Sequence, residues 1–208
     1  MPTLRPITTK AELEAYHQFR YRIYANSEQS GYLSGKPGFD IDAYDAHAIH
    51  LGWYEREELV GCVRLLDPIE GADPLHFLKD LDLGQRQLAD ELLQQERANG
   101  IPFCEVSRLC IDPAYRSLAH ARHFVLAIIQ AAVQHGRDIS YFTCDHAHAA
   151  FWQRMGFAVV PGFESYVRAR SPHKGALLRG SSVELLQKHR KEIMELGLLL
   201  AVPYMIAA

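Results

Sequence analysis

Hydrophobic residues recur along the chain at two spacings, alternating in short runs and returning every three to four residues in longer ones. The first spacing predicts strands with one buried face, and the second predicts helices that pack by one face. Glycine and proline separate the runs, because both residues end regular structure. The predicted elements, in chain order, are a strand at 2–8, a helix at 10–25, strands at 47–55 and 58–66, helical segments at 75–81 and 85–97, a strand from 103 to Asp112-Pro113, a helix ending at Gly136, a strand at 139–144, a helix at 147–155, strands at 157–161 and 164–170, and a helix from 181 or 182 to 196.

The stretches between these elements contain no repeat and no low-complexity linker, which indicates one α/β domain over residues 1–208. Residues 26–39 form a loop of Gly, Ser, Asn and Pro that is longer than a connection needs, as is typical of lids and binding loops. Residues 67–100 read as a helical insertion. Residues 171–208 read as a C-terminal extension, and its apolar end at 197–208 is expected to pack on the domain or on a partner.

The strand that begins at residue 103 carries polar residues where a central strand should be buried, namely Glu105, Ser107 and Arg108. Burying a carboxylate and a guanidinium costs free energy unless the two groups are paired or used. A structural ion pair between Glu105 and Arg108 would explain both, and so would a functional role. A helix follows this strand directly, and its first free amides suit a phosphate group.

Asp40, Asp42 and Asp45 place three carboxylates within six residues, where they repel one another unless they are solvated or face a cation. Composition alone favours a solvated loop. The segment lacks the glycine and the terminal glutamate of a calcium-binding EF-hand loop. Arg20 and Arg22 interrupt the apolar stripe of the first predicted helix, and snorkelling of their long side chains would explain this.

Charge and composition narrow the classes of function. The formal net charge is −3, which argues against non-specific nucleic-acid binding. The charge is uneven, with 10 Lys and Arg against 17 Asp and Glu in residues 1–104, and 12 against 8 in residues 105–208. An acidic first half and a basic second half suit a site that takes a cationic small molecule on one side and an anionic carrier on the other.

Neither a membrane-spanning run nor a signal peptide is visible, so we expect a cytoplasmic protein with no integral membrane segment. The cysteines lie in strand-like runs without a CxxC pair, which is typical of reduced, buried thiols. Histidines stand in close pairs with no third ligand apparent, so we predict no metal. These residues are Cys62, Cys104, Cys110 and Cys144, and the pairs His120/His123 and His146/His148.

The order of predicted elements resembles that of the GNAT acyltransferase superfamily. Residues 116–121, Arg-Ser-Leu-Ala-His-Ala, stand where that superfamily has its R/Q-x-x-G-x-G/A phosphate loop. Residues 149–157, Ala-Ala-Phe-Trp-Gln-Arg-Met-Gly-Phe, resemble its helix followed by Gly-Phe. The resemblance implies a GNAT fold, in which helices flank a mixed, mostly antiparallel central sheet.

Within that superfamily the chain resembles the acyl-homoserine-lactone (autoinducer) synthases and the related long-chain N-acyl amino acid synthases, over most of residues 15–160. The insertion at 67–100 also agrees with this branch. In the family the matching charged positions gather at one end of the sheet and form the acceptor site and its lid. The motifs are Arg20-x-x-x-Tyr24 for R-x-x-x-F, Asp40-x-Asp42-x-x-Asp45 for E-x-D-x-x-D, Gly61-x-x-Arg64-Leu-Leu for G-x-x-R-L-L, and Glu105-x-Ser107-Arg108 for E-x-S-R.

Two departures bear on the acceptor. The lactone synthases carry a tryptophan in the loop after the first helix, and residues 26–39 contain none. Their Arg-Leu-Leu is usually followed by Pro-Thr-Thr, and here Asp67-Pro68 follows. Both weaken S-adenosylmethionine as the acceptor, so we place an N-acyl amino acid synthase ahead of a lactone synthase. An ordinary acetyl-coenzyme A acetyltransferase and a non-catalytic GNAT-like binding module remain as alternatives.

The resemblance implies acyl transfer from a thioester to the amine of a small acceptor. A backbone amide of the central strand would hold the carbonyl oxygen, near Leu109, Cys110 and Ile111. Glu105 would accept the amine proton through water, with Arg108 orienting it. Many acetyltransferases place an acidic tyrosine on the short helix, and Trp152 stands there instead.

The phosphate loop bears on the donor. Ala119 and Ala121 replace its glycines and leave less room for the pyrophosphate of coenzyme A, so we favour acyl carrier protein over acyl-coenzyme A, and expect no permanently bound cofactor. Carrier proteins are acidic, and the second half of the chain offers basic partners. The residues expected around the pantetheine arm and the acyl chain are Arg116 and His120 in the loop, and Phe142 and Trp152 beyond it.

Overall fold

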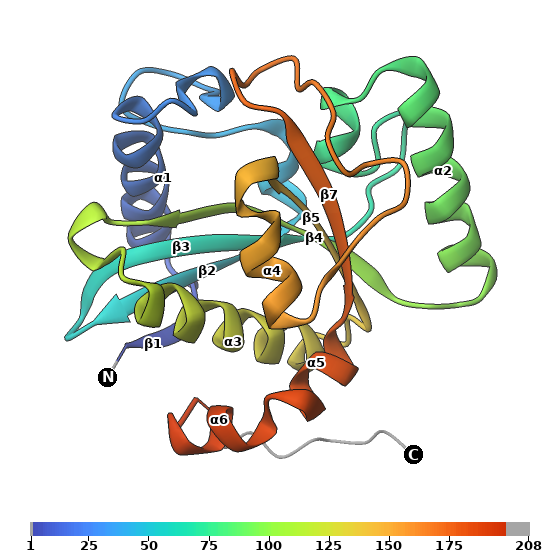
Figure 1. Cartoon of the computed structure of the whole chain (residues 1–208). Helices are drawn as coiled ribbons and strands as arrows, with labels where there is room; N and C mark the ends of the chain where they lie inside the picture. The colour runs from blue at the N-terminus through green and yellow to red at the C-terminus, as the bar shows by residue number, and fades with distance from the viewer. Residues whose placement is uncertain (1, 199–208) are drawn as a thin grey trace.

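Seven strands form one mixed sheet in the order β1-β2-β3-β4-β5-β7-β6. The computed structural model describes residues 2–198 (Figure 1). All neighbouring strands are antiparallel except β4 and β5, which run parallel, so the predicted GNAT-like α/β fold is confirmed. The strands are β1 (Thr3–Pro6), β2 (Ala48–Glu55), β3 (Glu58–Leu66), β4 (Phe103–Ile111), β5 (Ile139–Asp145), β6 (Ala158–Val159) and β7 (Gly175–Ser181).

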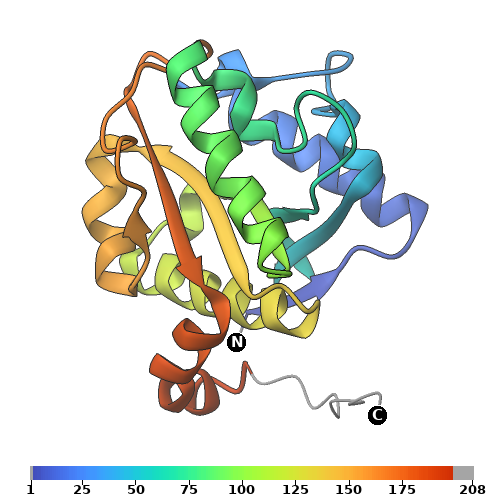
Figure 2. The ribbon, with the colours of Figure 1, turned by 90° about the vertical axis from the view of Figure 1, so that its right-hand side faces the viewer.

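Helices cover both faces of this sheet (Figures 1 and 2). On one face, α1 packs against Cys62 and Cys110, and α2 packs against a cluster that includes Phe103 and Tyr141. On the other face, α3 packs against β2, β3 and β4, and α4, α5 and α6 join it over Phe142. The helices are α1 (Lys10–Ala25), α2 (Leu83–Ala98), α3 (Leu118–Gln134), α4 (Ala149–Met155), α5 (Ser182–Lys188) and α6 (Arg190–Glu195), with short 3₁₀ helices η1 (Ser30–Tyr32), η2 (Ala43–His47), η3 (His76–Asp80), η4 (Pro113–Tyr115) and η5 (His146–His148).

Local sequence signals explain where the longer helices begin. Thr9 and Glu12 form a capping box at the start of α1, and Asp82 and Gln85 form another at the start of α2. Each box satisfies backbone amides that have no partner inside the helix. The Ser117 side chain caps α3 in the same way, by accepting from the His120 amide. The helix predicted at 10–25 is confirmed residue for residue.

The C-terminal part of the sheet differs from the prediction. The strand predicted at 164–170 is wrong, because those residues form a loop, and the strand lies at Gly175–Ser181 instead. Two glycines lower the strand signal of β7, yet the packing requires one of them. A Cβ at Gly180 would lie 2.4 Å from the Phe157 ring. The final helix is also divided, into α5 and α6, with His189 between them.

Two irregularities in β4 shape the centre of the sheet. Its parallel register with β5 runs only from Phe103 to Glu105, after which the two strands separate. Its register with β3 shifts between Cys62 and Arg64, and Arg108 has a positive φ of 55° at this point. Such a bulge bends the strand and redirects its side chains. The gap and the bulge lie side by side.

Two of the remaining connections contain helical elements. Residues 26–39 include η1, and the insertion at 67–100 contains η3 and α2.

None of the helices within residues 2–198 combines the length and the apolar character that crossing a bilayer requires. The expected packing of the apolar end concerns residues 197–208, of which 199–208 lie outside the described residues; Leu198 packs against both clusters on the α3 face.

Candidate active site

A cavity of about 260 Å³ lies between β4 and β5, where their pairing has ended. Its wall on the α3 side is apolar, and the opposite end is polar, since that end is closed by the loop after α1, by η3 and by the loop before β7. The cavity therefore offers an apolar chain and a polar headgroup separate environments. The apolar wall includes Leu109, Val125, Ile128, Ile129, Phe142 and Trp152, and the polar end includes Tyr32, His76, Glu105, Ser107, Arg108 and Arg168.

Glu105 lies at the polar end, on β4 just where β5 departs. Its residue exposure is 2%, and the backbone amide of Phe77 donates to Oε2 at 3.1 Å. Burial raises the pKa of Glu105 to about 7, although the charge of Arg64 and the amides of Phe77 and His76 act in the opposite direction. A carboxylate with a pKa near 7 can exchange a proton at neutral pH, which is what a general base requires.

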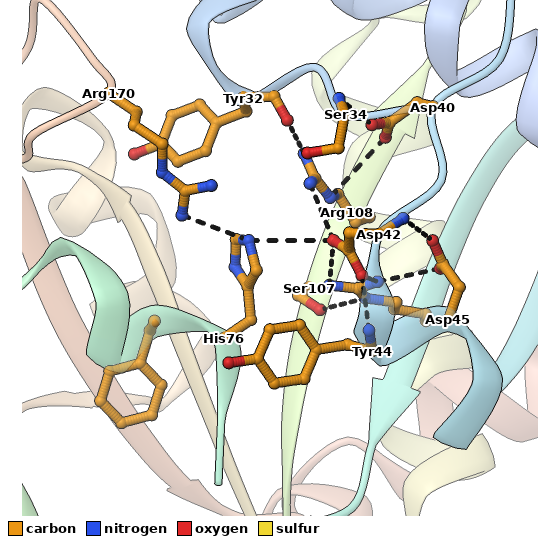
Figure 3. Close-up of polar contacts among 12 residues, drawn as sticks. Tyr32, Ser34, Asp40, Asp42, Tyr44, Asp45, His76, Ser107, Arg108 and Arg170 are labelled. Atoms are coloured by element: carbon orange, nitrogen blue, oxygen red, sulfur yellow. Dashed lines mark hydrogen bonds and ion pairs between the residues drawn. The ribbon is translucent and has the colours of Figure 1, made fainter. Parts of the chain in front are cut away.

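Three arginines and three aspartates form a buried network behind this end of the cavity. Figure 3 shows the three aspartates with Arg108. Arg20 of α1 binds Asp40 at 2.9 Å and Asp45 at 2.7 Å. Arg64 of β3 binds Asp42 at 2.7 Å and Asp45 at 2.9 Å, and its Nε donates to Ser107 Oγ at 2.9 Å. Arg108 of β4 donates to Asp42 at 2.9 Å and to the Tyr32 carbonyl at 2.9 Å.

The network corrects two expectations. Asp40 and Asp45 are buried, so this is not a solvated loop, and Arg20 is fully buried at 0% exposure, so it does not snorkel. Burial alone would raise the pKa of Asp45, but hydrogen bonds and charge pairing with Arg20 and Arg64 outweigh it and lower the pKa to about 2. The same balance holds the pKa of Asp42 below its ordinary range, through Arg64 and Arg108. Asp42 and Asp45 are therefore ionised at neutral pH.

The residues predicted for the acceptor site converge, but most of them do not reach the cavity. Glu105, Ser107 and Arg108 line it. The structural ion pair between Glu105 and Arg108 that was one of the two explanations is absent among the described residues, because Arg108 is engaged by Asp40 and Asp42. The others stand behind the cavity wall, namely Arg20, Asp40, Asp42, Asp45 and Arg64.

The residues predicted for the donor also divide into two groups. Leu109, Phe142 and Trp152 line the cavity. Cys110 faces α1 on the other side of the sheet, whereas Ile111 and Ala121 pack in the core under α3. Arg116 donates to the Ile111 carbonyl at 2.9 Å. Ala119 and His120 line a separate surface hollow near the β2–β3 turn.

Three residues at the polar end were not predicted as site residues, namely Tyr32, His76 and Arg168. Tyr32 lies in the loop at 26–39 that was expected to bind, and Arg168 is one of the basic residues expected to face a carrier protein. His76 lies in the insertion, and Arg168 lies in the segment predicted to be a strand. The Tyr32 ring lies near two guanidinium groups, at 4.9 Å from Arg170 and 6.0 Å from Arg168. The loop after α1 and the loop before β7 are in close contact here, since a Cβ at Gly31 would lie 2.4 Å from the Arg170 carbonyl oxygen.

This fold and this cleft define a class of acyl-transferring protein, and comparison with known families agrees. The family model of the acetyltransferase (GNAT) domain matches residues 19–125, which is more than half of the chain. The chain therefore belongs to the GNAT family and is an acyltransferase. No curated protein matches the chain.

Several solved structures share the fold. The N-acyl amino acid synthase FeeM from uncultured soil microbes is 18% identical with a TM-score of 0.62, over 90% of this chain and 94% of that one. The AHL synthase LasI is 18% identical with a TM-score of 0.64, over 88% and 90%. BjaI, a coenzyme A-dependent acyl-homoserine lactone synthase, is 16% identical with a TM-score of 0.64, over 92% and 89%. At these identities the likeness concerns the fold.

The buried network should be essential for stability. We expect Arg20→Leu to lower the free energy of unfolding by roughly 3 to 5 kcal/mol, because it leaves buried carboxylates without their partner. Arg22→Leu is the matched control on the same helix, since Arg22 is exposed and pairs with Asp112 at 3.3 Å. That exposed pair should contribute about 1 kcal/mol at most. Urea denaturation of both variants measures the difference, and equal losses would contradict the assignment.

Glu105 should leave a pH signature in stability. A carboxyl whose pKa is raised on folding contributes stability that is complete below its unfolded pKa, near 4.5, and is lost as the pH rises through about 7. Glu105→Gln removes that loss while Gln can still accept the Phe77 amide. Between pH 5 and pH 8.5 we expect the variant to gain roughly 2 to 3 kcal/mol relative to the unmodified protein. A pH-independent difference in denaturation would place the pKa of Glu105 at its ordinary value.

Proposed function

We propose that this protein transfers a fatty acyl group from a carrier thioester to the amine of a small amino acid-like acceptor. The observation that carries this proposal is the cavity at the gap between β4 and β5, with an apolar wall along α3 and Glu105 at its polar end. An acyl chain would lie along Val125, Ile128 and Ile129, and the thioester carbonyl would lie beside the β4 bulge.

The backbone of β4 can polarise that carbonyl. The Asp112 amide donates to the Val60 carbonyl of β3 at 2.9 Å, and successive residues of a strand turn their amides to opposite neighbours. The amides of Leu109 and Ile111 are therefore directed to the side of β5, which is no longer paired with β4 here. An amide held in this position stabilises the oxyanion that forms as the amine attacks.

The proton balance assigns a role to Glu105. The amine nitrogen bonds to the carbonyl carbon, the carbon–sulfur bond breaks, and the thiol of the carrier leaves as a thiolate. The amine loses one proton, which Glu105 accepts through a water molecule. A pKa of about 7 suits this task, because the carboxylate is ionised in a useful fraction of molecules and still binds the proton.

The acceptor is a small amine whose binding does not need an unpaired carboxylate of the protein. Each of the three aspartates is already matched by arginine, and the network that they form is neutral overall. A sulfonium group would find no free negative charge in it. This observation supports an amino acid-like acceptor over S-adenosylmethionine.

The donor is acyl carrier protein in preference to acyl-coenzyme A. Ala119 and Ala121 stand at the start of α3, and the methyl group of Ala119 reduces the room for a pyrophosphate at the surface. Not all of the basic residues of the second half are available to an acidic carrier. Arg122, Arg168 and Arg170 pair with Glu192, Asp145 and Asp80, while Arg154 and Lys174 are exposed.

A panel of thioesters tests the reaction. Acetyl, octanoyl and palmitoyl groups on acyl carrier protein and on coenzyme A are incubated with amino acids or with S-adenosylmethionine, while free thiol and acylated product are followed. We expect long acyl groups on the carrier protein to react fastest with amino acids, and Glu105→Gln to lower kcat/KM by about 100-fold or more. Fastest turnover of acetyl-coenzyme A would favour an ordinary acetyltransferase. Consumption of no thioester would favour a binding module.

The apolar wall should set the acyl length. Ile129→Phe adds bulk to a buried residue that lines the cavity, so it should shift the preference of the enzyme towards shorter acyl groups. Ile129→Met keeps the volume and serves as the control. The measurement is the ratio of kcat/KM for octanoyl and palmitoyl donors, which cancels a general loss of activity. An unchanged ratio would place the acyl chain elsewhere.

A further inference from the structure

A histidine from the insertion lies beside Glu105. His76 begins η3, is 7% exposed and lines the cavity. Its Nδ1 lies 3.8 Å from Glu105 Oε1. Its Nε2 lies 3.2 Å from Arg170 Nη2 and 3.9 Å from Asp42 Oδ2 (Figure 3). The ring edge packs against Tyr44, with centroids 5.4 Å apart. The imidazole thus connects the loop before β7 with the carboxyl group on β4.

The contacts of this imidazole determine its tautomer. A guanidinium group carries only hydrogen-bond donors, so Nε2 of His76 must accept from Arg170 with its lone pair. Burial lowers the pKa of His76 well below its ordinary value, and the charges of Arg108 and Arg64 lower it further. The ring is therefore neutral and carries its one proton on Nδ1, the nitrogen nearest to Glu105.

We propose that His76 is a positioning residue, whose Nδ1–H stabilises the ionised carboxylate of Glu105, and that Arg170 fixes the tautomer that makes this possible. This inference rests on the proposed acyl transfer and identifies what prepares its base. The distance of 3.8 Å is an electrostatic contact, and a small rotation of either side chain would make it a hydrogen bond. The Phe77 amide already holds the other carboxylate oxygen at 3.1 Å.

The surroundings favour a neutral donor at this place. Arg64 from β3, Arg108 from β4, Asp42 before β2 and Arg170 from the loop before β7 all face His76 or Glu105. A second proton would give the ring a positive charge, which these guanidinium groups would repel, whereas the neutral ring still offers Nδ1–H to Glu105. Arg170 also pairs with Asp80 of η3 at 2.9 Å, so one side chain anchors both ends of this short helix.

The pH profile of kcat/KM with a long-chain thioester distinguishes this role from simple packing. His76→Leu removes the donor, so the acid limb of the profile should move upward by about one pH unit, with a rate about tenfold lower below the limb. The rate at high pH should approach that of the unmodified enzyme. His76→Gln offers an N–H donor and should restore the original limb. His47→Leu makes the same change at an exposed histidine and should alter nothing.

A second measurement does not depend on activity. Titration of the Glu105 carboxyl carbon by ¹³C NMR should show the same upward shift in His76→Leu and a smaller one in Arg170→Met, which leaves the ring in place and frees Nε2. If no thioester reacts but the midpoint moves, the proposed function fails and the positioning role stands. The role is overturned if the midpoint is unchanged in both variants, or if activity falls equally at all pH values and Gln does not restore it. If His76→Leu does not fold, the midpoint in Arg170→Met decides alone.

Discussion

Three guanidinium groups and three carboxylates, buried together where α1, β3 and β4 meet, are the interaction on which the rest of this structure depends. A buried charge costs several kcal/mol unless its partner and its hydrogen bonds are all present. Here each arginine comes from a different element, and the aspartates come from the segment between α1 and β2. The network therefore holds these elements in one arrangement and ties the loop after α1 to the sheet through Arg108 and the Tyr32 carbonyl.

The network also separates structural from chemical roles in the motif residues. Arg20, Asp40, Asp45 and Arg64 use their polar atoms on one another and stand away from the cavity, so their task is to hold the wall. Arg108 belongs to both environments, because its guanidinium completes the network and its residue lines the cavity. Glu105 remains outside the network and accepts from the Phe77 amide, and its burial raises its proton affinity.

Much of the fold and many of the site residues could be predicted from the sequence, and the elements and residues that were missed have physical explanations. Capping residues and apolar spacing predicted α1 exactly, since both signals are local. The motif residues predicted that Arg20, Asp42 and Arg64 would gather, but a motif does not say which side of a wall a side chain faces. The β7 strand was missed because it contains glycines, and the reason for Gly180 is the close approach of the Phe157 ring, which lies far away in the chain. His76 was missed for the same reason, because it contacts Glu105 and Arg170, which lie far from it in the chain.

The short pairing of β4 with β5 has a further mechanical consequence. Strands β1 to β4 form one plate and strands β5, β7 and β6 form another, and in the described chain the two plates share a register over only three residues of each strand. Each plate is antiparallel within itself. The helix α3 packs against both plates and bridges them on the apolar side. A bulky group inserted between β4 and β5 would therefore meet only this short ladder, and it could separate the two plates without breaking the antiparallel ladders on either side.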